Sequence, residues 1–232
     1  MTDFEKLLAG LHSANEKTRA KSAFKLGGLG HELVIEPLIL AFSDPSARVR
    51  RQVVFALGKF NDSRVTETLV MALDDSDMEI RRKSIAALRK SQDTKAREGL
   101  TSAFHKESDG YMRACLLSAL GRINDIGSRD LFISALGDSE QDVREVALAI
   151  QKQVSDPKAV TAVIALLDDN YLCGRAISVL GNLGNSQAIE PLEKFTRNFS
   201  ASGHWGDYCR QLAQKAIAYI QQGKHGSFPL WM

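Results

Sequence analysis

The sequence predicts an all-α protein built from repeated helix pairs. An arginine recurs at intervals of 31 or 32 residues, apolar residues follow helical rather than alternating spacing, and aromatic residues make up only 7% of the chain. Repeat proteins show such a period because one helix pair cannot bury its apolar face alone and has to stack on its neighbours. The low aromatic content disfavours a β-sandwich and suits helices rich in alanine and leucine.

One arginine position sets the repeat. It is occupied by Arg19, Arg50, Arg81, Arg113 and Arg144, and in the last two repeats by Cys173 and Arg210. Acidic residues keep step with it: Asp44, Asp75, Glu107 and Asp138 stand six residues before an arginine, and Asp62, Asp93, Asp125 and Asp156 stand twelve residues after one. These positions predict one domain, 1–222, with repeats at about 2–30, 31–61, 62–92, 93–124, 125–155, 156–184 and 185–222. Residues 223–232 would form a C-terminal tail.

Each repeat is predicted to contain two helices joined by a turn. In the third repeat, SRVTETLVMAL (63–73) and MEIRRKSIAALRK (78–90) both carry apolar residues at helical spacing. The acidic residues before such segments stand where N-caps are needed, because a carboxylate accepts the free N–H groups of a first turn. No segment alternates well enough to predict a strand.

The repeats resemble HEAT repeats, in particular the short type of phycobilisome lyase-like proteins. DPSARVRRQVVFALGKF (44–60) and DPKAVTAVIALLDD (156–169) match that repeat almost position by position. Pro37 and Pro191 stand at the same point of a first helix, in IEPL both times. The resemblance implies a right-handed α-solenoid (superhelix) of about seven antiparallel helix pairs. Its first helices would form the convex face and its second helices the concave face.

In HEAT-like families, the acidic residue and the arginine of the inter-helix turn form a ladder between successive repeats. The resemblance assigns this structural role to Asp44/Arg50, Asp75/Arg81, Glu107/Arg113 and Asp138/Arg144. Arginine suits it because its guanidinium presents five donors in a rigid fork that matches a carboxylate. In the sixth repeat, Cys173 stands in place of the arginine, so we expect a looser or differently packed junction between that repeat and the next.

Basic residues gather on the second helices of the second to fourth repeats. The candidate contacts for an acidic surface of a partner protein are Arg51, Lys59, Arg82, Lys90 and Arg122. The other interpretation is an ordinary solvated face, because scattered surface lysines and arginines are common. In the pair Arg50–Arg51, we therefore assign the first arginine to the ladder and the second to binding.

The last repeat departs from the others by a longer connection, RNFSASGHWGDYCR (197–210). His204, Trp205 and Tyr208 are candidate contacts in this loop; alternatively, the two aromatic residues cap the exposed end of the core. The tail ends in FPLWM and cannot continue a helix through Pro229. We expect it to fold back over the last helix pair or to serve as a short binding motif.

The leading functional hypothesis is a non-catalytic scaffold or adaptor that binds another protein in its concave groove. The sequence contains no phosphate-binding glycine loop, nucleophile elbow or HExxH motif, so we predict no catalytic residue, metal site or cofactor. The resemblance leaves a bilin lyase-type or phycobilisome-associated role as the alternative. Nucleic-acid binding is disfavoured, because the net charge is only +2 and Phe55 is the one aromatic residue expected near the basic residues.

The chain is expected to be cytoplasmic and not membrane-bound. Its longest apolar stretch, VTAVIALL (160–167), is far shorter than the ~20 residues of a membrane-spanning helix. The N-terminal segment lacks the pattern of a secretory signal, and three widely spaced cysteines are typical of reduced thiols. The oligomeric state is left open.

Overall fold

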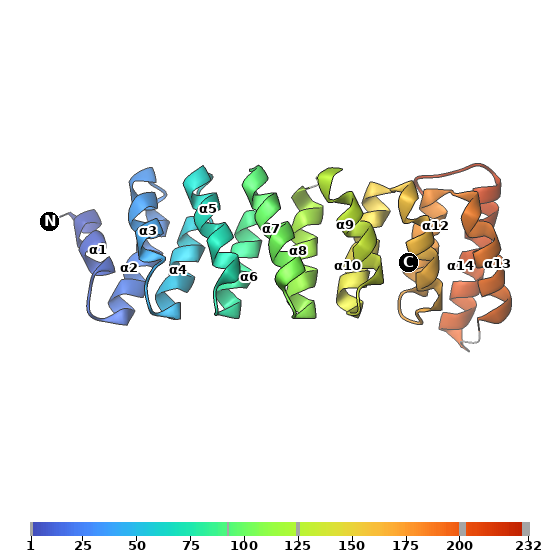
Figure 1. Cartoon of the computed structure of the whole chain (residues 1–232), viewed down its shortest axis with the longest axis horizontal. Coiled ribbons are helices and arrows are strands. Elements are labelled where there is room, and N and C mark those ends of the chain that lie inside the picture. Colours follow the sequence, from blue (N-terminus) through green and yellow to red (C-terminus); the bar gives the residue numbers. More distant parts are fainter. Residues whose placement is uncertain (1, 92, 124–125, 200–202, 229–232) are drawn as a thin grey trace. The chain divides into compact units, whose positions relative to one another are not determined.

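The computed structural model describes residues 2–91, 93–123, 126–199 and 203–228. The chain divides into two compact units, Met1–Asp125 and Ile126–Met232, called here the N-terminal and the C-terminal unit. Both consist of helices, and no strand occurs in the described part of the chain. Within each unit, neighbouring helices stand side by side in pairs (Figure 1).

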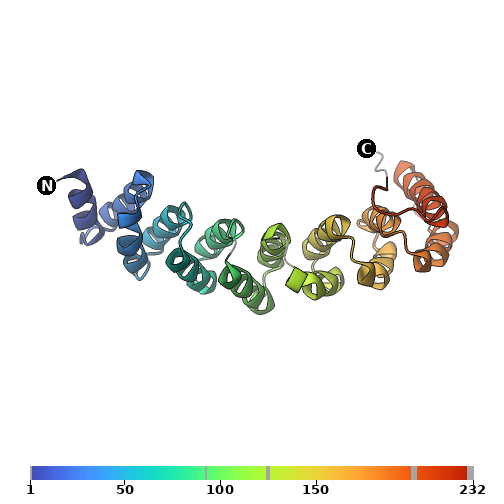
Figure 2. The ribbon, with the colours of Figure 1, turned by 90° about the horizontal axis from the view of Figure 1, so that it is seen from above.

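The N-terminal unit contains four helix pairs. Their bounds are α1 (Asp3–Leu11) with α2 (Glu16–Leu29), α3 (Ile35–Ala41) with α4 (Ala47–Leu57), α5 (Ser63–Met71) with α6 (Met78–Leu88), and α7 (Thr94–Lys106) with α8 (Gly110–Ile123). Short 3₁₀ turns are η1 (Glu32–Val34) and η2 (Ala72–Asp74). The second helices pack in a row, with α2 on α4, α4 on α6 and α6 on α8. Figure 2 shows first and second helices in separate layers.

The C-terminal unit contains three helix pairs. They are α9 (Arg129–Ser134) with α10 (Gln141–Val154), α11 (Val160–Ala165) with α12 (Cys173–Leu183), and α13 (Ile189–Asn198) with α14 (His204–Gln221). Its 3₁₀ turns are η3 (Ile126–Ser128), η4 (Ala135–Gly137), η5 (Pro157–Ala159), η6 (Leu166–Asp168) and η7 (Ser186–Ala188). Here α10 packs on α12, and α12 packs on α14.

The predicted all-α solenoid class is confirmed by these seven pairs. The predicted N-caps are also present. Each aspartate carboxylate accepts the N–H group two residues later, at the start of a helix or turn: Asp62 from Arg64, Asp93 from Lys95, and Asp156 from Lys158. Asp125 lies outside the described residues. The single domain 1–222 stays a prediction.

No helix in the described part of the chain is long and apolar enough to cross a membrane.

The core repeats with the sequence. Seven residues after the repeated arginine stand Leu26, Leu57, Leu88 and Leu120, all at most 1% exposed. In α10 the same position holds Gln151, which is 0% exposed, and neither of its amide atoms has a hydrogen-bond partner among the residues the structure describes. The C-terminal unit therefore has a polar group in a place that the N-terminal unit fills with leucine.

The second helices approach each other closely at a glycine. A Cβ atom on Gly27 of α2 would lie 2.3 Å from the Cβ of Ala56 in α4, and one on Gly58 would lie 2.9 Å from the Cβ of Ala87. Any larger side chain would push neighbouring helices apart. This small-residue contact lets α2, α4 and α6 form one tight row.

The tail returns to α12 after α14 ends. The N–H of Gly226 donates to the carbonyl of Asn182 at 2.7 Å, and the N–H of Phe228 donates to its side-chain Oδ1 at 2.6 Å. The Phe228 ring is 5% exposed and covers Gly181, where a Cβ would come within 2.6 Å of it. Up to Phe228 the tail therefore folds back onto the last helices as expected, and residues 229–232 lie outside the described chain.

Candidate functional site

The repeated arginines link successive repeats. In the N-terminal unit, Nε of Arg50 donates to Oδ2 of Asp75 at 2.7 Å, and Nη2 donates to Oδ1 at 2.9 Å. Its Nη1 donates to the backbone carbonyls of Asp44 and Pro45 in the turn of its own repeat. Arg19 makes the same fork with Asp44, and Arg144 in the C-terminal unit reaches Asp169 at 2.8 Å.

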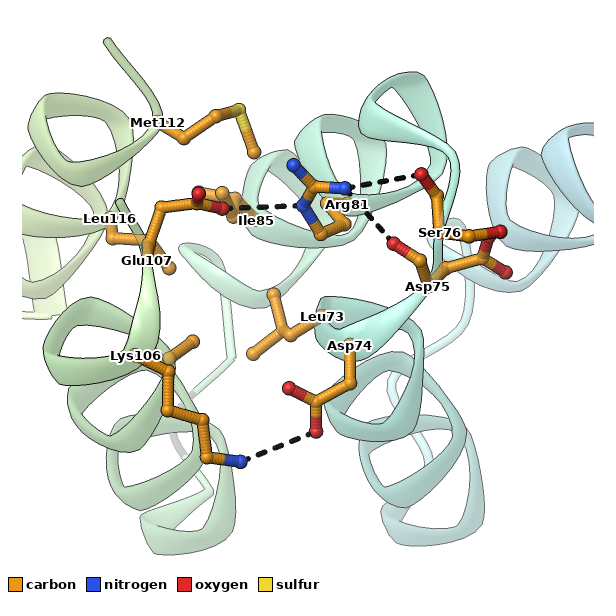
Figure 3. A pocket seen from close by; sticks show the side chains of 11 residues that line it. Leu73, Asp74, Asp75, Ser76, Arg81, Ile85, Lys106, Glu107, Met112 and Leu116 are labelled. Atoms are coloured by element: carbon orange, nitrogen blue, oxygen red, sulfur yellow. Dashed lines mark hydrogen bonds and ion pairs between the residues drawn. The ribbon is translucent and has the colours of Figure 1, made fainter. Parts of the chain in front are cut away.

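Figure 3 shows this link at Arg81, which lies between two repeats. Its guanidinium donates to the carbonyls of Asp75 and Ser76 on one side and to the carboxylate of Glu107 on the other. Lys106 and Asp74 form a second pair across the same junction at 3.5 Å. The residues around them line a pocket of about 310 Å³, which belongs to the repeat junction.

The acidic partner of a ladder arginine differs from the expected one: it is the carboxylate of the following repeat and not that of the arginine's own turn. Arg50 binds the carboxylate of the following repeat, Asp75, and only a backbone carbonyl of Asp44 in its own turn. The physical reason is that Oδ1 of Asp44 accepts the N–H of Ser46 and both carboxylate oxygens face Arg19 of the preceding repeat. In the turn of its own repeat, Arg113 likewise donates to the backbone carbonyls of Glu107 and Ser108. Oδ1 of Asp138 accepts the N–H of Glu140, and its backbone carbonyl accepts a hydrogen bond from Arg144.

The links are buried and electrostatically favourable. The side chain of Arg50 is 16% exposed and that of Asp75 is 6% exposed. The hydrogen bonds from Arg50 hold the pKa of Asp75 below its ordinary value, and Arg19 lowers the pKa of Asp44 in the same way. Each carboxylate thus stays ionised in the fold and binds its arginine as an ion.

Two of the candidate binding arginines are engaged within the protein. Arg51 forms an ion pair with Asp77, the N-cap residue of α6 in the next repeat, and lowers the pKa of that carboxylate. Arg82 forms a two-armed pair with Glu79, three residues earlier on α6, with both distances 3.0 Å. Both arginine side chains are 42% exposed, and each carries a carboxylate partner that offsets its charge. Their contact with a partner protein stays a prediction.

The remaining basic side chains lie around two exposed aromatic rings. Phe24 on α2 and Phe55 on α4 are 50% and 43% exposed, and their rings stack at 5.9 Å with 14° between planes. Nζ of Lys59 lies 5.0 Å from the centre of the Phe55 ring, and Nζ of Lys83 lies 5.6 Å from it. No carboxylate lies within ion-pair distance of either lysine in the described chain. Phe24, Phe55, Lys59 and Lys83 are called here the aromatic–lysine cluster.

The cluster contains a residue that sequence reasoning missed. Phe55 was expected to be the one aromatic near the basic residues, but Phe24 stacks directly on it. The repeat could have predicted this neighbour, because each phenylalanine stands five residues after a repeated arginine, Arg19 or Arg50. Lys90 and Arg122 are exposed, and among the described residues neither forms an ion pair or a contact with the rings of the cluster.

The C-terminal unit has a different feature on its second helices. A pocket of about 790 Å³ is lined by α10, α12 and α14, and His204, Trp205 and Tyr208 form its α14 wall. These three residues lie in the first turns of α14 and not in a loop, because the helix already begins at His204. Trp205 and Tyr208 stack at 5.6 Å, and the tryptophan Nε1–H donates to the carbonyl of Asn170.

Two thiols lie at the junction where Cys173 replaces the repeated arginine. Sγ of Cys173 on α12 lies 3.8 Å from Sγ of Cys209 on α14, and both residues are 0% exposed. Burial raises the pKa of both thiols, that of Cys209 to about 12. Both are therefore protonated at neutral pH and are poor nucleophiles. Within the part of the chain that the structure covers, no three metal-ligating side chains come together.

Comparison with protein-family models identifies two matches. A model described as HEAT repeats matches residues 4–89 and 35–121, which together span half of the chain. A model described as PBS lyase HEAT-like repeat matches residues 172–198. No curated protein sequence matches the chain.

Solved structures show the same fold. A chain of the complex of CpcE and CpcF of phycocyanin lyase from Nostoc sp. PCC7120 is 19% identical, with a TM-score of 0.54 over 93% of this chain and 95% of its own. The archaeal HEAT-like repeats protein from Thermococcus onnurineus is 14% identical, with a TM-score of 0.57 over 96% and 98%. A chain from a structure of the interaction between cadherin and β-catenin is 15% identical, with a TM-score of 0.55 over 93% and 54%. At these identities the likeness establishes the fold alone.

Proposed function

The chain belongs to the HEAT-repeat family, and from this premise we propose that it is a non-catalytic scaffold that binds another protein. The binding surface is the exposed face of α2, α4 and α6, centred on the aromatic–lysine cluster. The partner segment carries acidic side chains together with apolar or aromatic ones.

The observation that carries this proposal is the exposure of two stacked aromatic rings beside two lysines that form no ion pair with a described carboxylate. Phe24 and Phe55 are about half exposed, although large apolar groups normally gain by leaving water. Lys59 and Lys83 lie over the Phe55 ring, and neither forms an ion pair with a carboxylate in the described chain. Nζ of Lys59 donates to the carbonyl of Gly27, and the pKa of Glu79 is lowered by its hydrogen bonds from Arg82 and, in addition, by the charge of Lys83. A partner that covers the rings and brings carboxylates to the lysines would satisfy both, and aromatic residues are enriched at such contacts.

The fold supports a protein partner. Repeat proteins present extended surfaces built from successive helices, and two of the similar structures come from protein–protein complexes. The charge of the surface differs from the sequence-based expectation. Arg51 and Arg82 pair with Asp77 and Glu79, so the lysines supply the positive charge.

A selection from a phage-displayed random peptide library tests the proposal. Wild-type protein should enrich peptides that combine Asp or Glu with Phe, Tyr, Trp or Leu, and the double variant Phe24→Ala/Phe55→Ala should lose at least tenfold in affinity for them. The control is Leu40→Ala/Met71→Ala, which removes two apolar side chains of greater exposure from α3 and α5. Equal peptide binding by both double variants would sink the proposal.

The same rings offer a surface for bases of single-stranded nucleic acid, which also stack on aromatic side chains beside positive charge. A titration with a labelled oligonucleotide separates the two classes of partner. We expect weak binding that the two phenylalanine substitutions leave unchanged. Tight, Phe24- and Phe55-dependent binding would replace a protein partner by a nucleic acid.

A second candidate function is chromophore handling of the bilin lyase type. It is favoured by the likeness to phycocyanin lyase over nearly the whole of both chains and by the 790 Å³ pocket, which has apolar walls and the basic side chains Lys152 and Arg175. Co-expression with a bilin supply and a phycocyanin subunit tests it. A covalently coloured subunit, detected on a denaturing gel, supports this function, and a colourless one in the presence of free bilin contradicts it.

A further inference from the structure

The pocket of the C-terminal unit lies over small residues of α12. One and five residues after the repeated arginine position, α4 carries Arg51 and Phe55, whereas α12 carries Gly174 and Ser178. Both α12 residues line the pocket, whose walls come from α10 and α14. The small side chains thus leave a space of about 790 Å³, which is within the range of sites that hold small molecules.

The charge of the pocket favours an anion. The charged side chains of its described lining are those of Lys152 and Arg175, and no carboxylate is among them. Arg175 is paired with Glu145 at 2.9 Å. Lys152 is exposed and forms no ion pair within the part of the chain that the structure covers. An anionic group of a ligand would therefore find its counter-ion in Lys152.

Two aromatic rings bound this face of α12 along the helix. A Cβ atom on Gly174 would lie 3.1 Å from the ring of Trp205, and one on Gly181 would lie 2.6 Å from the ring of Phe228. The two glycines stand at positions i and i+7, on the same side of the helix. At a rise of 1.5 Å per residue they are about 10 Å apart. This length fits a compact body of one or two fused rings.

The lining favours an aromatic body with a hydrogen-bonding group. Leu148 and Val179 line the pocket, and so does Trp205, which is 48% exposed and stacks with Tyr208. A further ring would gain by packing against the indole. Ser178 is 2% exposed, and its hydroxyl has no hydrogen-bond partner among the described residues. A ligand group that bonds to this hydroxyl would remove an unfavourable unpaired state.

We propose that this pocket binds a compact aromatic carboxylic acid that carries a further hydroxyl or carbonyl group. The ring body packs against Trp205 over α12, and the carboxylate pairs with Lys152. The second polar group forms a hydrogen bond with the hydroxyl of Ser178. Binding is reversible and requires neither the protein partner nor the bilin of the functions proposed above.

Calorimetric titration of the full chain with 6-hydroxy-2-naphthoate tests the proposal. Two reference compounds each lack one feature: 2-naphthol has no carboxylate, and octanoate has no ring. Both should bind at least tenfold more weakly than 6-hydroxy-2-naphthoate. Equal binding of octanoate, or no binding of 6-hydroxy-2-naphthoate at millimolar concentration, would overturn the proposal. Biliverdin that binds more tightly than 6-hydroxy-2-naphthoate would overturn the compact ligand class and support the bilin lyase-type function.

Two pairs of variants assign the binding to this pocket. Ser178→Phe fills the floor with the side chain that α2 and α4 carry at this repeat position, and it should abolish binding. Its control is Ser118→Phe, at the same repeat position of α8, where the serine is exposed. Lys152→Met should weaken 6-hydroxy-2-naphthoate about tenfold and leave 2-naphthol unchanged, whereas Lys158→Met, outside the pocket, should leave both unchanged. Equal weakening by the two lysine variants would place the carboxylate elsewhere and contradict the proposed site.

The hydroxyl of Ser178 is tested by a pair of ligands. In the wild-type protein, 6-hydroxy-2-naphthoate should bind several-fold more tightly than 2-naphthoate. Ser178→Ala should remove this difference, because the hydroxyl that distinguishes the two ligands then has no partner. A difference that survives in Ser178→Ala would exclude the proposed hydrogen bond.

Discussion

In the N-terminal unit, Arg19, Arg50 and Arg81 each join two repeats through a carboxylate. In the C-terminal unit, Arg144 makes such a link to Asp169, but the next junction is formed by the thiols of Cys173 and Cys209. The cores differ in the same way, because the leucine position of the N-terminal unit is occupied by Gln151 in α10.

The two units also differ in where they offer surface to other molecules. In the regular N-terminal repeats, the exposed aromatic residues Phe24 and Phe55 lie on the outer surface of the second helices, and the junction at Arg81 encloses a pocket of about 310 Å³. The irregular C-terminal repeats leave a pocket between their second helices, with the buried hydroxyl of Ser178 facing the space. The two units thus offer different surfaces: exposed aromatic rings on regular repeats, and a larger pocket with apolar walls where the repeat becomes irregular. The following changes test this contrast.

Removing a ladder arginine should have the largest effect. Arg50→Ala leaves the buried carboxylate of Asp75 and two turn carbonyls without their donor, so we expect a loss of about 3 kcal/mol in the free energy of unfolding. Urea denaturation followed by circular dichroism measures it. Arg64→Ala, which removes a half-exposed arginine paired with Asp62, should lose less than about 1 kcal/mol. Similar losses in the two variants would mean that the ladder does not carry the stability of the N-terminal unit.

Acid should weaken the same links. The folded pKa values of Asp44 and Asp75 lie below the ordinary 3.8. Their ion pairs therefore contribute fully above that pH, and the contribution is lost as the pH falls through the folded values. We expect the melting temperature to drop below pH 4. In Asp75→Asn the drop should be shallower, because that position no longer titrates; an unchanged slope would exclude Asp75 as a source of the acid sensitivity.

Restoring the leucine position should stabilise the C-terminal unit. Gln151→Leu removes two unsatisfied buried amide atoms and adds an apolar side chain of similar size, so we expect a gain of about 1–2 kcal/mol. The reverse change in the N-terminal unit, Leu120→Gln, should destabilise by at least as much. A loss of stability in Gln151→Leu, measured by urea denaturation, would show that Gln151 is satisfied by a group beyond the described residues.

The smallest effect is expected at Arg82. Its pair with Glu79 lies within one helix, and both side chains are about 40% exposed. Such pairs contribute about 0.2–0.5 kcal/mol, and salt screens them. Arg82→Ala should therefore change the melting temperature only slightly, and still less at 1 M salt. A large, salt-resistant loss would place Arg82 among the structural arginines.

Much of the fold was predictable because the same sequence pattern recurs in several repeats. The arginine position, the acidic positions and the helical spacing of apolar residues predict the helix pairs. The partners of the arginines were not predictable, because Arg50 has one repeated carboxylate six residues before it, Asp44, and another 25 residues after it, Asp75, and either could form a ladder. Only the packed structure shows that the guanidinium reaches forward to Asp75 and its Nη1 backward to a carbonyl.

The candidate site was predictable only in part. The sequence predicts Lys59 and Arg51 as exposed basic residues of one face, but not the ion pair of Arg51 with Asp77, because Asp77 stands outside the repeated acidic positions. Phe24 could have been found from its register with Phe55. The pocket beside Ser178 could not, since it depends on how α10, α12 and α14 leave space between them.

The forked arginine has a consequence for how such a protein lengthens in evolution. Each link joins an arginine to an acidic residue 25 or 26 positions later, so an internal repeat of the regular stretch contributes one donor to the next repeat and one acceptor to the preceding one. Duplicating a whole repeat inside the gene would leave every such link intact, whereas inserting or deleting half a repeat would separate a donor from its acceptor. Within the regular stretch, inheritance should therefore change the number of repeats in whole steps.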